Sequence, residues 1–297
     1  MTAFGLINLN KPAGWTSHDC VAKVRHLLRI KKVGHGGTLD PKATGVLPIA
    51  FGKATRLLQF MPDPKSYRAF VRFGVQTTTD DLEGEIIRKQ DGASLTLEQV
   101  EPHLAQFIGN IEQIPPAYSA IQQDGKRLYE LARAGKRVDV PSRRVNVFDI
   151  EVINWYAGEH PEIELGISCG GGTYIRAIAR DLGNAVGTGA TLAALERTLS
   201  CSLTLDTSLT LEELDHQLQQ GTFTPVYPDA ALTHLNAITL PTDTAKRWCQ
   251  GQRIANWDSN PSLTQFLRIY NLENEFLGIS EVREQNNTLI LAPKVVF

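Results

Sequence analysis

The chain has 297 residues, 42% of them hydrophobic, which is enough for one or two domains with a sizeable buried core. Its apolar runs are too short to cross a membrane, and its first residues have neither the basic head nor the apolar centre of a secretory signal. We therefore expect no membrane attachment. The net charge of −2, taken over the whole chain, is unfavourable for a protein that binds nucleic acid.

The cysteines are spaced too irregularly for a disulfide framework or a zinc site. They are Cys20, Cys169, Cys201 and Cys249. Isolated thiols of this kind are typical of a reducing compartment, so we expect a cytoplasmic protein without a structural metal.

Two helices are predicted in the first 110 residues. Ser17 is a candidate cap for a helix whose apolar residues recur at helical spacing up to Leu28. Thr96 and Gln99 have the spacing of a capping box and predict a second helix that continues to Ile108.

A strand followed by a helix is predicted between residues 162 and 186. Apolar and polar residues alternate from Glu162 to Cys169, which is typical of a half-buried strand. Three glycines from Gly170 predict a turn, and Thr173 is expected to open a helix that runs to Val186.

The last third of the chain changes character. Thr210 and Glu213 predict a capped helix that Gly221 ends. The segment 222–241 has three prolines and little charge, and it is interpreted as a link. A short helix closed by Gly251 and three strand-like runs follow, so we expect a mixed α/β domain over 1–225 and a small β-rich domain over 240–297.

The segment from Gly34 to Gly45 (GHGGTLDPKATG) presents one carboxylate, Asp40, in a loop rich in glycine. Pro41 disfavours helical backbone at Asp40 and so presents its side chain from extended chain. Glycines in this loop allow another backbone or a ligand to approach closely. From these residues alone, an ordinary solvated turn and a functional loop both remain open.

This segment resembles the catalytic motif of the TruB family, the bacterial tRNA pseudouridine-55 synthases. The resemblance covers the longer string GHGGTLDPKATGVLPIAFGKATR, and four further strings resemble family motifs in the family's order. They are NKPAGWTSHDCVAKVR, SYRAFVRFGVQTTTDDLEGE, IPPAYSAIQQDGKRLYELARAGKRV and CGGGTYIRAIARDLG, and the five extend from about Asn8 to Arg197.

The resemblance implies an α+β pseudouridine-synthase fold, with a large mixed antiparallel sheet and a central cleft, followed by a small β-rich PUA-like domain. It implies isomerisation of uridine 55 in the T-arm loop of tRNA to pseudouridine. The N-glycosidic bond breaks, the base turns, and a C–C glycosidic bond forms, so no cofactor or metal is expected.

Three site residues are implied as catalytic. Asp40 matches the aspartate that acts at the sugar or the base, either by covalent attack or by removing a sugar proton. Burial beneath a base would raise its pKa, and Arg176, the arginine of GTYIR, would oppose that shift as a neighbouring cation. Tyr67 matches the tyrosine that stacks on the base and assists the final deprotonation. Without the resemblance, Arg176 would be interpreted as a surface arginine in the first turn of a helix.

Base flipping is implied as well, because the target uridine lies in a folded loop. His35 resembles the residue that wedges into the loop, and Tyr174 and Leu195 match further pocket contacts. Lys11 and Pro12 resemble a segment that supports the catalytic loop.

Basic residues gather in two stretches, Lys23–Lys32 and Lys126–Arg144, whereas Asp206 onward holds 6 Lys or Arg against 11 Asp or Glu. Local basic stripes are what phosphate contact needs, although charge runs are also ordinary solvated helix surface. Because both stretches lie inside or beside family motifs, we interpret them as contacts with tRNA. We expect the acidic tail to contribute little to tRNA binding. The expected phosphate contacts are Lys23, Arg25, Lys31, Lys32, Lys126, Arg127, Arg133, Arg143 and Arg144.

The chain departs from the family pattern at Gly36, Gln122 and Gly171, where threonine, lysine, and lysine or serine are frequent. These changes remove a hydroxyl and two expected phosphate contacts.

Two alternatives stay open: a non-catalytic chaperone that folds tRNA in the same cleft, and a guide-RNA-dependent synthase of the archaeal and eukaryotic type. The second would need partner proteins, whereas we expect a monomer without an obligate protein partner.

Overall fold

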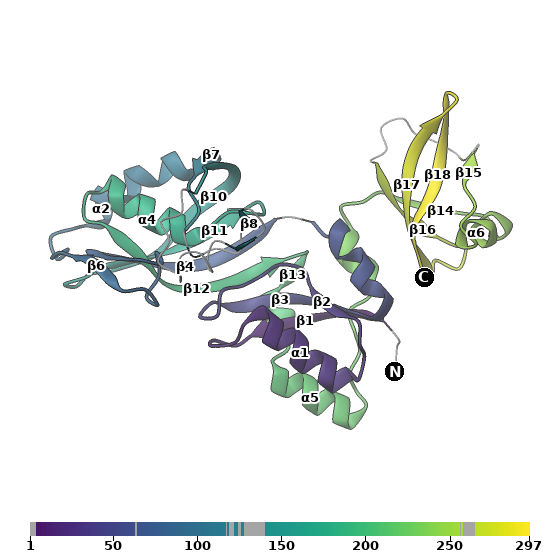
Figure 1. Cartoon of the computed structure of the whole chain (residues 1–297), viewed down its shortest axis with the longest axis horizontal. Coiled ribbons are helices and arrows are strands. Elements are labelled where there is room, and N and C mark those ends of the chain that lie inside the picture. The colour runs from purple at the N-terminus through teal and green to yellow at the C-terminus, as the bar shows by residue number, and fades with distance from the viewer. Residues whose placement is uncertain are drawn as a thin grey trace.

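A computed structural model describes residues 4–62, 64–116, 118, 122–123, 126–127, 140–255, 257 and 265–297. Two β-sheets dominate the described residues, one in each part of the chain (Figure 1). None of the helices in these ranges is long and apolar enough to span a bilayer.

The larger sheet contains nine strands of the described chain. Its main path runs β1 (Gly5–Lys11), β3 (Thr44–Phe51), β12 (Ala190–Ser200), β4 (Lys65–Phe73), β11 (Glu162–Cys169), β10 (Arg143–Tyr156) and β7 (Gly109–Gln113). β2 (Val33–His35) pairs with β3, and β13 (Leu203–Thr204) pairs with β12. Neighbours are antiparallel except β3 and β12, which are parallel. The predicted large mixed sheet and the strand Glu162–Cys169 are therefore confirmed.

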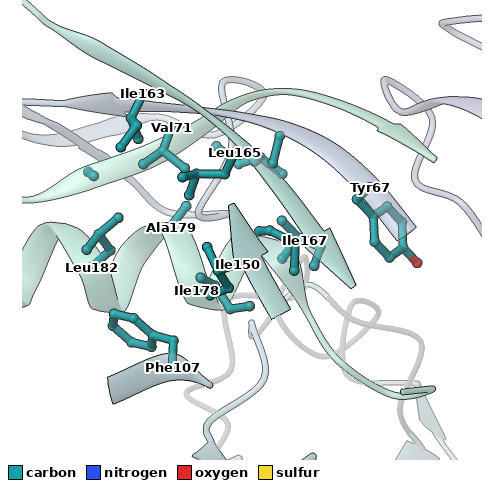
Figure 2. Packing of buried hydrophobic residues seen from close by; sticks show 14 of the residues in the cluster. Tyr67, Val71, Phe107, Ile150, Ile163, Leu165, Ile167, Ile178, Ala179 and Leu182 are labelled. Atoms are coloured by element: carbon teal, nitrogen blue, oxygen red, sulfur yellow. The ribbon is translucent and has the colours of Figure 1, made fainter. Parts of the chain in front are cut away.

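Two groups of helices cover different parts of this sheet (Figure 1). α1 (Ser17–Leu28) and α5 (Leu211–Gln220) pack on β1 and β3. α4 (Ile175–Ala185), α2 (Leu97–Val100) and the 3₁₀ helix η2 (Glu101–Phe107) pack on β4, β11 and β10. Figure 2 shows this second core, where Tyr67 lies at one margin with its hydroxyl directed away from Phe107 and Leu182.

Two helices start at a different residue from the one predicted. α1 is capped by Thr16 in a capping box with Asp19, because the Ser17 hydroxyl is engaged by the backbone of Leu39. α4 begins at Ile175 with Tyr174 as N-cap, because the Thr173 hydroxyl donates to the carbonyl of Gly170 in the preceding turn.

The helix predicted from Thr96 has its capping box, but it is α-helical only to Val100 and continues as η2. Pro102 lacks an amide hydrogen and cannot close an α-helical bond, which favours the change to tighter turns. The predicted cap of α5 by Thr210 and Glu213, and its end at Gly221, are confirmed.

The smaller sheet has the order β14 (Ala237–Thr239), β16 (Phe266–Tyr270), β17 (Phe276–Gln285), β18 (Thr288–Val296) and β15 (Ile254–Ala255). α6 (Thr242–Cys249) packs on it through the buried Trp248. The three predicted strand-like runs and the short helix are confirmed. Part of the segment interpreted as a link instead forms the 3₁₀ helix η4 (Pro228–Leu232) and β14, whereas the domain limits at 225 and 240 stay predictions.

The two sheets are joined through the 3₁₀ helix η1 (Gly52–Phe60). Leu57 and Phe60 of η1 lie in one buried cluster with Leu232, Tyr270 and Val295. The smaller sheet thus shares a core with the larger part of the protein.

Two short strand pairs lie outside these sheets: the hairpin β5 (Val75–Thr77) with β6 (Ile86–Lys89), and the pair β8 (Gln122–Gln123) with β9 (Lys126–Arg127). The 3₁₀ turn η3 (Leu205–Thr207) follows β13. The β5–β6 hairpin matters for the site, because the turn between its strands carries Asp80 and Asp81.

Candidate active site

The loop between β2 and β3 presents Asp40 and is held in place at several points. Gly36 N donates to the carbonyl of Pro48 (2.8 Å), and Ala43 N donates to the carbonyl of Asp40 itself (3.1 Å). Next to Asp40, the amide of Leu39 donates to the Ser17 hydroxyl of α1 (2.9 Å). The carboxylate therefore stands on a fixed loop rather than on a mobile turn.

A buried lysine supports the far side of this loop. Lys11 Nζ donates to the carbonyls of Pro12 (2.9 Å), Trp15 (2.6 Å) and Pro41 (2.9 Å). Burial is the main cause that lowers the pKa of Lys11. Because Pro41 follows Asp40 directly, Lys11 fixes the carboxylate's neighbour, in agreement with the supporting role implied by the sequence.

Arg176, in the first turn of α4, reaches the Asp40 carboxylate. Its Nη2 lies 3.0 Å from Asp40 Oδ2, which confirms the predicted ion pair. The guanidinium is itself fixed, because Nη1 donates to the carbonyl of Thr79 (3.1 Å) and Nη2 to that of Tyr118 (3.1 Å). Only 7% of the Arg176 side chain is exposed, so this is a buried cation and not a surface arginine.

The electrostatics at Asp40 have two opposed causes. Burial among the surrounding segments raises the pKa of Asp40, and the charge of Arg176 is the main influence that opposes the rise. The Asp40 side chain keeps 42% of its surface accessible, which leaves the carboxylate open to a ligand. An acid on a fixed loop, accessible and paired with a buried cation, suits either nucleophilic attack or proton abstraction.

Asp81 is a member of this site that sequence reasoning did not single out. Its Oδ2 lies 3.4 Å from Arg176 Nη1, and its Oδ1 accepts from the Thr79 hydroxyl (2.5 Å). Its charge adds to the rise in the pKa of Asp40. The signal available in the sequence was the pair of adjacent acids in TTTDDLEGE. Among the described residues, no cluster of three or more His, Cys, Asp or Glu side chains is placed to hold a metal ion.

Tyr67 lies in β4, directly opposite Ile167 of β11 and Arg197 of β12. Its side chain is buried, and burial is the main cause that raises the pKa of its phenol. The charge of Asp40 adds to this rise, so the phenol and the carboxylate share one electrostatic environment. Tyr67 thus lies beside Arg197, whose guanidinium donates to the carbonyls of Gly37 and Thr38 in the loop that carries Asp40.

Three further residues are expected to bind the substrate: His35 by wedging into the RNA loop, and Tyr174 and Leu195 as pocket contacts. His35 ends β2, accepts a hydrogen bond from Gly37 N at Nδ1 (3.3 Å), and packs edge-on against His18. Tyr174 caps α4, and its backbone exchanges two hydrogen bonds with the Gln113 side chain. Leu195 packs against the same buried cluster as Tyr67. Their contacts with a base stay predictions.

Comparison with known proteins agrees with this arrangement. The sequence model of the TruB family pseudouridylate synthases (N-terminal domain) matches residues 25–175, and the C-terminal model of pseudouridine synthase II TruB matches residues 237–297. A tRNA pseudouridine synthase B of Trichormus variabilis is 59% identical over 294 residues, covering 99% of this chain and 98% of that protein. The chain belongs to the TruB family.

A second relative and a solved structure are also similar along nearly the whole chain. A tRNA pseudouridine synthase B of Gloeothece citriformis is 58% identical over 301 residues, covering 100% of this chain and 98% of that one. A chain in the crystal structure of a Cbf5–Nop10–Gar1 complex is 26% identical, with a TM-score of 0.74 over 99% of this chain and 84% of that chain. The match along the whole chain confirms the predicted TruB family and the pseudouridine-synthase fold.

Most residues expected to contact phosphates in this TruB protein lie at its surface. Arg25 on α1, Lys31 and Lys32 after it, and Arg144 on β10 are exposed, and Lys23 is half-buried. The half-buried Arg143, which starts β10, has an Nε atom that meets no partner within the described structure. Lys126 and Arg127 belong to β9, whose side chains lie outside the described part, as does the whole of Arg133. Contact with RNA stays a prediction for all nine residues.

Proposed function

We propose that this enzyme isomerises uridine 55 in the T-arm loop of tRNA to pseudouridine, with Asp40 as the group that acts at the nucleotide. The observation that carries the proposal is the ion pair of Asp40 with the buried Arg176, on a fixed loop beside Tyr67. The relatives named tRNA pseudouridine synthase B supply the substrate class.

The proposed reaction is an isomerisation, so every atom of the uridine is kept. The bond from C1′ to N1 breaks, the base rotates, and a bond from C1′ to C5 forms, after which C5 loses its proton and N1 gains one. Arg176 keeps Asp40 ionised for the first step, whether that step is attack on the sugar or removal of a sugar proton. We assign the final deprotonation to Tyr67.

Flipping of uridine 55 requires that its position in the loop be filled and its faces be held. We assign the first task to His35 and the second to Tyr67, Tyr174 and Leu195. The hydrogen bond from Gly37 N to His35 Nδ1 favours this role, because it orients the imidazole beside the catalytic loop.

Recognition of the tRNA is assigned to the stretches Lys23–Lys32 and Lys126–Arg144. The exposed positions of Arg25, Lys31, Lys32 and Arg144 support this assignment, because their charged ends are open to phosphate oxygens. We expect the enzyme to act as a monomer in the cytoplasm, and its four cysteines form no disulfide, as is usual in reducing compartments. The intact ion pair disfavours the alternative of a chaperone without catalytic activity.

The decisive experiment maps pseudouridine at single-nucleotide resolution in tRNA treated with the wild-type protein or with Asp40→Asn. Wild-type protein should convert uridine 55, and Asp40→Asn should bind the same tRNA with little conversion, because the amide keeps the shape of the side chain without its charge. A transcript with cytidine at position 55 is the substrate control. Turnover by Asp40→Asn close to that of the wild type would refute the assignment.

A further inference from the structure

Arg197 is a fully buried arginine that the proposed chemistry does not use. It lies in β12, between β3 and β4, and none of its surface is accessible. Burying a charged group is costly unless its donors are satisfied. Within the described residues Arg197 forms no ion pair with a carboxylate, so its positive charge is retained in the core for another reason.

The Arg197 guanidinium is satisfied by backbone carbonyls that lie on both sides of Asp40. Nε donates to Val46 O (2.7 Å), Nη2 to Gly37 O (3.1 Å) and Nη1 more weakly to Thr38 O (3.4 Å). Gly37 and Thr38 precede the catalytic carboxylate, and Val46 belongs to the strand that follows it. One side chain therefore fixes the start and the end of the catalytic loop.

The sheet register places the same residue beside the phenol of Tyr67. Arg197 is the cross-strand partner of Tyr67 on one side and of Gly45 on the other. Burial is the main cause that raises the pKa of Tyr67, with Cys169 and Asp40 adding to the rise, and the positive charge of the neighbouring Arg197 opposes it. Arg197 is thus the main group that makes loss of the Tyr67 proton easier.

We propose that Arg197 is a positioning residue that couples the two halves of the reaction. It holds the loop that carries Asp40 and, through the same guanidinium, orients the Tyr67 hydroxyl and stabilises its negative charge. The inference rests on the proposed function for its catalytic consequence, but the contact with Tyr67 is a property of the free protein. A lysine could not replace it, because a single ammonium group does not present the planar fork that reaches three carbonyls.

The test compares Arg197→Met and Arg197→Lys with the wild type in two measurements. The first is the titration of Tyr67 in the free protein, followed by fluorine NMR after fluorotyrosine incorporation and assigned with Tyr67→Phe. The second is turnover on tRNA, resolved into kcat and KM, with melting curves to establish that each variant is folded. Arg72→Met is the matched control. Arg72 lies in β4, the strand of Tyr67, but on the opposite face, where it forms an ion pair with Glu162.

In Arg197→Met the phenol pKa of Tyr67 should rise, and kcat should fall about 100-fold while KM changes little, since a misplaced loop affects chemistry more than binding. Arg197→Lys should raise the pKa of Tyr67 less than Arg197→Met does, because the positive charge is kept. Its kcat should still fall, because most hydrogen bonds to the carbonyls are lost. Arg72→Met should change neither quantity.

An unchanged Tyr67 titration in a folded Arg197→Met protein would overturn the proposal, and so would a kcat within about threefold of the wild type. If Arg197→Met does not fold, Arg197→Lys decides by its kcat alone. The titration needs no substrate, so it tests Arg197 even if the wild-type protein forms no pseudouridine.

Discussion

Arg176 binds Asp40 through one end of its guanidinium and faces Asp81 with the other, at 3.0 Å and 3.4 Å. The two carboxylates therefore share one buried cation. Each carboxylate weakens the electrostatic stabilisation that Arg176 gives to the other. Asp81 also adds to the rise in the pKa of Asp40 that burial causes. Together with burial, these two charges determine the pH range in which Asp40 is ionised. Removing one or the other should therefore have opposite effects.

Arg176→Met and Asp81→Asn should move the acidic limb of the pH–rate profile in opposite directions. The rate falls on the acidic side as Asp40 becomes protonated, and its pKa is already above the ordinary value. Removing Arg176 removes the main influence that lowers this pKa, so the limb should move to higher pH. Removing the Asp81 charge should move it to lower pH. Single-turnover rates measured across the acidic range would check both, and a shift in the same direction would contradict this account.

Asp40→Asn should be at least as stable as the wild type at neutral pH. The pKa of Asp40 is raised in the folded state, so wild-type stability is higher while the carboxyl is protonated. This additional stability is lost as the pH rises from the pKa of Asp40 in the unfolded state to its higher pKa in the folded state. The amide stays neutral throughout and avoids this loss.

Melting temperatures of the wild type and Asp40→Asn at neutral and at acidic pH would check this. The advantage of the variant should shrink as the pH falls. A variant that melts well below the wild type at neutral pH would show that the ion pair with Arg176 outweighs the cost of burial.

The Asp40 loop could be predicted from the sequence because its features are local: glycines, one carboxylate and a following proline. The contact of Arg176 with Asp40 could not be predicted from local pattern, which indicated a surface arginine, and it was expected only from the resemblance. It depends on the packing of α4 on β4, β11 and β10 and on the strand order that brings this part of the sheet close to β3, and periodicity does not reveal strand order.

Arg197 illustrates the same limit. A lone arginine in a strand-like run is usually exposed. It is buried here because β12 is inserted between β3 and β4, and the pairing of β12 with β3 is parallel, joining segments that no short-range signal connects. The cap predicted at Ser17 is one residue too late and the helix start predicted at Thr173 is two residues too early, because both hydroxyls are engaged elsewhere, that of Ser17 by Leu39 and that of Thr173 by Gly170.

Gly45→Ala should be far more destabilising than Gly14→Ala, although both glycines have positive φ. Gly45 has a φ of +96°, and a Cβ there would lie 2.3 Å from the backbone oxygen of Arg197. Gly14 has a φ of +83° with nothing within 4 Å of the same position. Gly14→Ala should cost only the strain of about 1–2 kcal/mol for a left-handed residue. Gly45→Ala should add a further ~1–3 kcal/mol or more from the backbone clash.

Denaturant unfolding of both variants gives the comparison, with the slope checked for two-state behaviour. Equal losses of stability would show that β3 and β12 separate at no cost near Arg197. In that case the loop that carries Asp40 is not held by this strand pair.

Basic residues of the larger part of the protein should dominate tRNA affinity, and those of the smaller sheet should contribute little. Arg25→Ala, Lys32→Ala and Arg144→Ala should each weaken binding irrespective of RNA sequence and reduce the salt dependence by nearly one unit of slope, because each removes about one phosphate contact. The small contribution of the smaller sheet is expected from the excess of acidic residues after Asp206, which repels the tRNA backbone.

Truncation is a poor test of the smaller sheet, because removing it would expose Leu57 and Phe60 of the shared core. Lys246→Ala and Arg247→Ala on the exposed side of α6 leave this shared core intact and are the better comparison, with affinity measured against salt concentration for all five variants. Unchanged affinity in these two, beside clear losses in Arg25→Ala and Arg144→Ala, is the expected result. If the α6 variants lose more affinity than the others, the smaller sheet is a principal RNA-binding element, and its cations act locally despite the acidic surroundings.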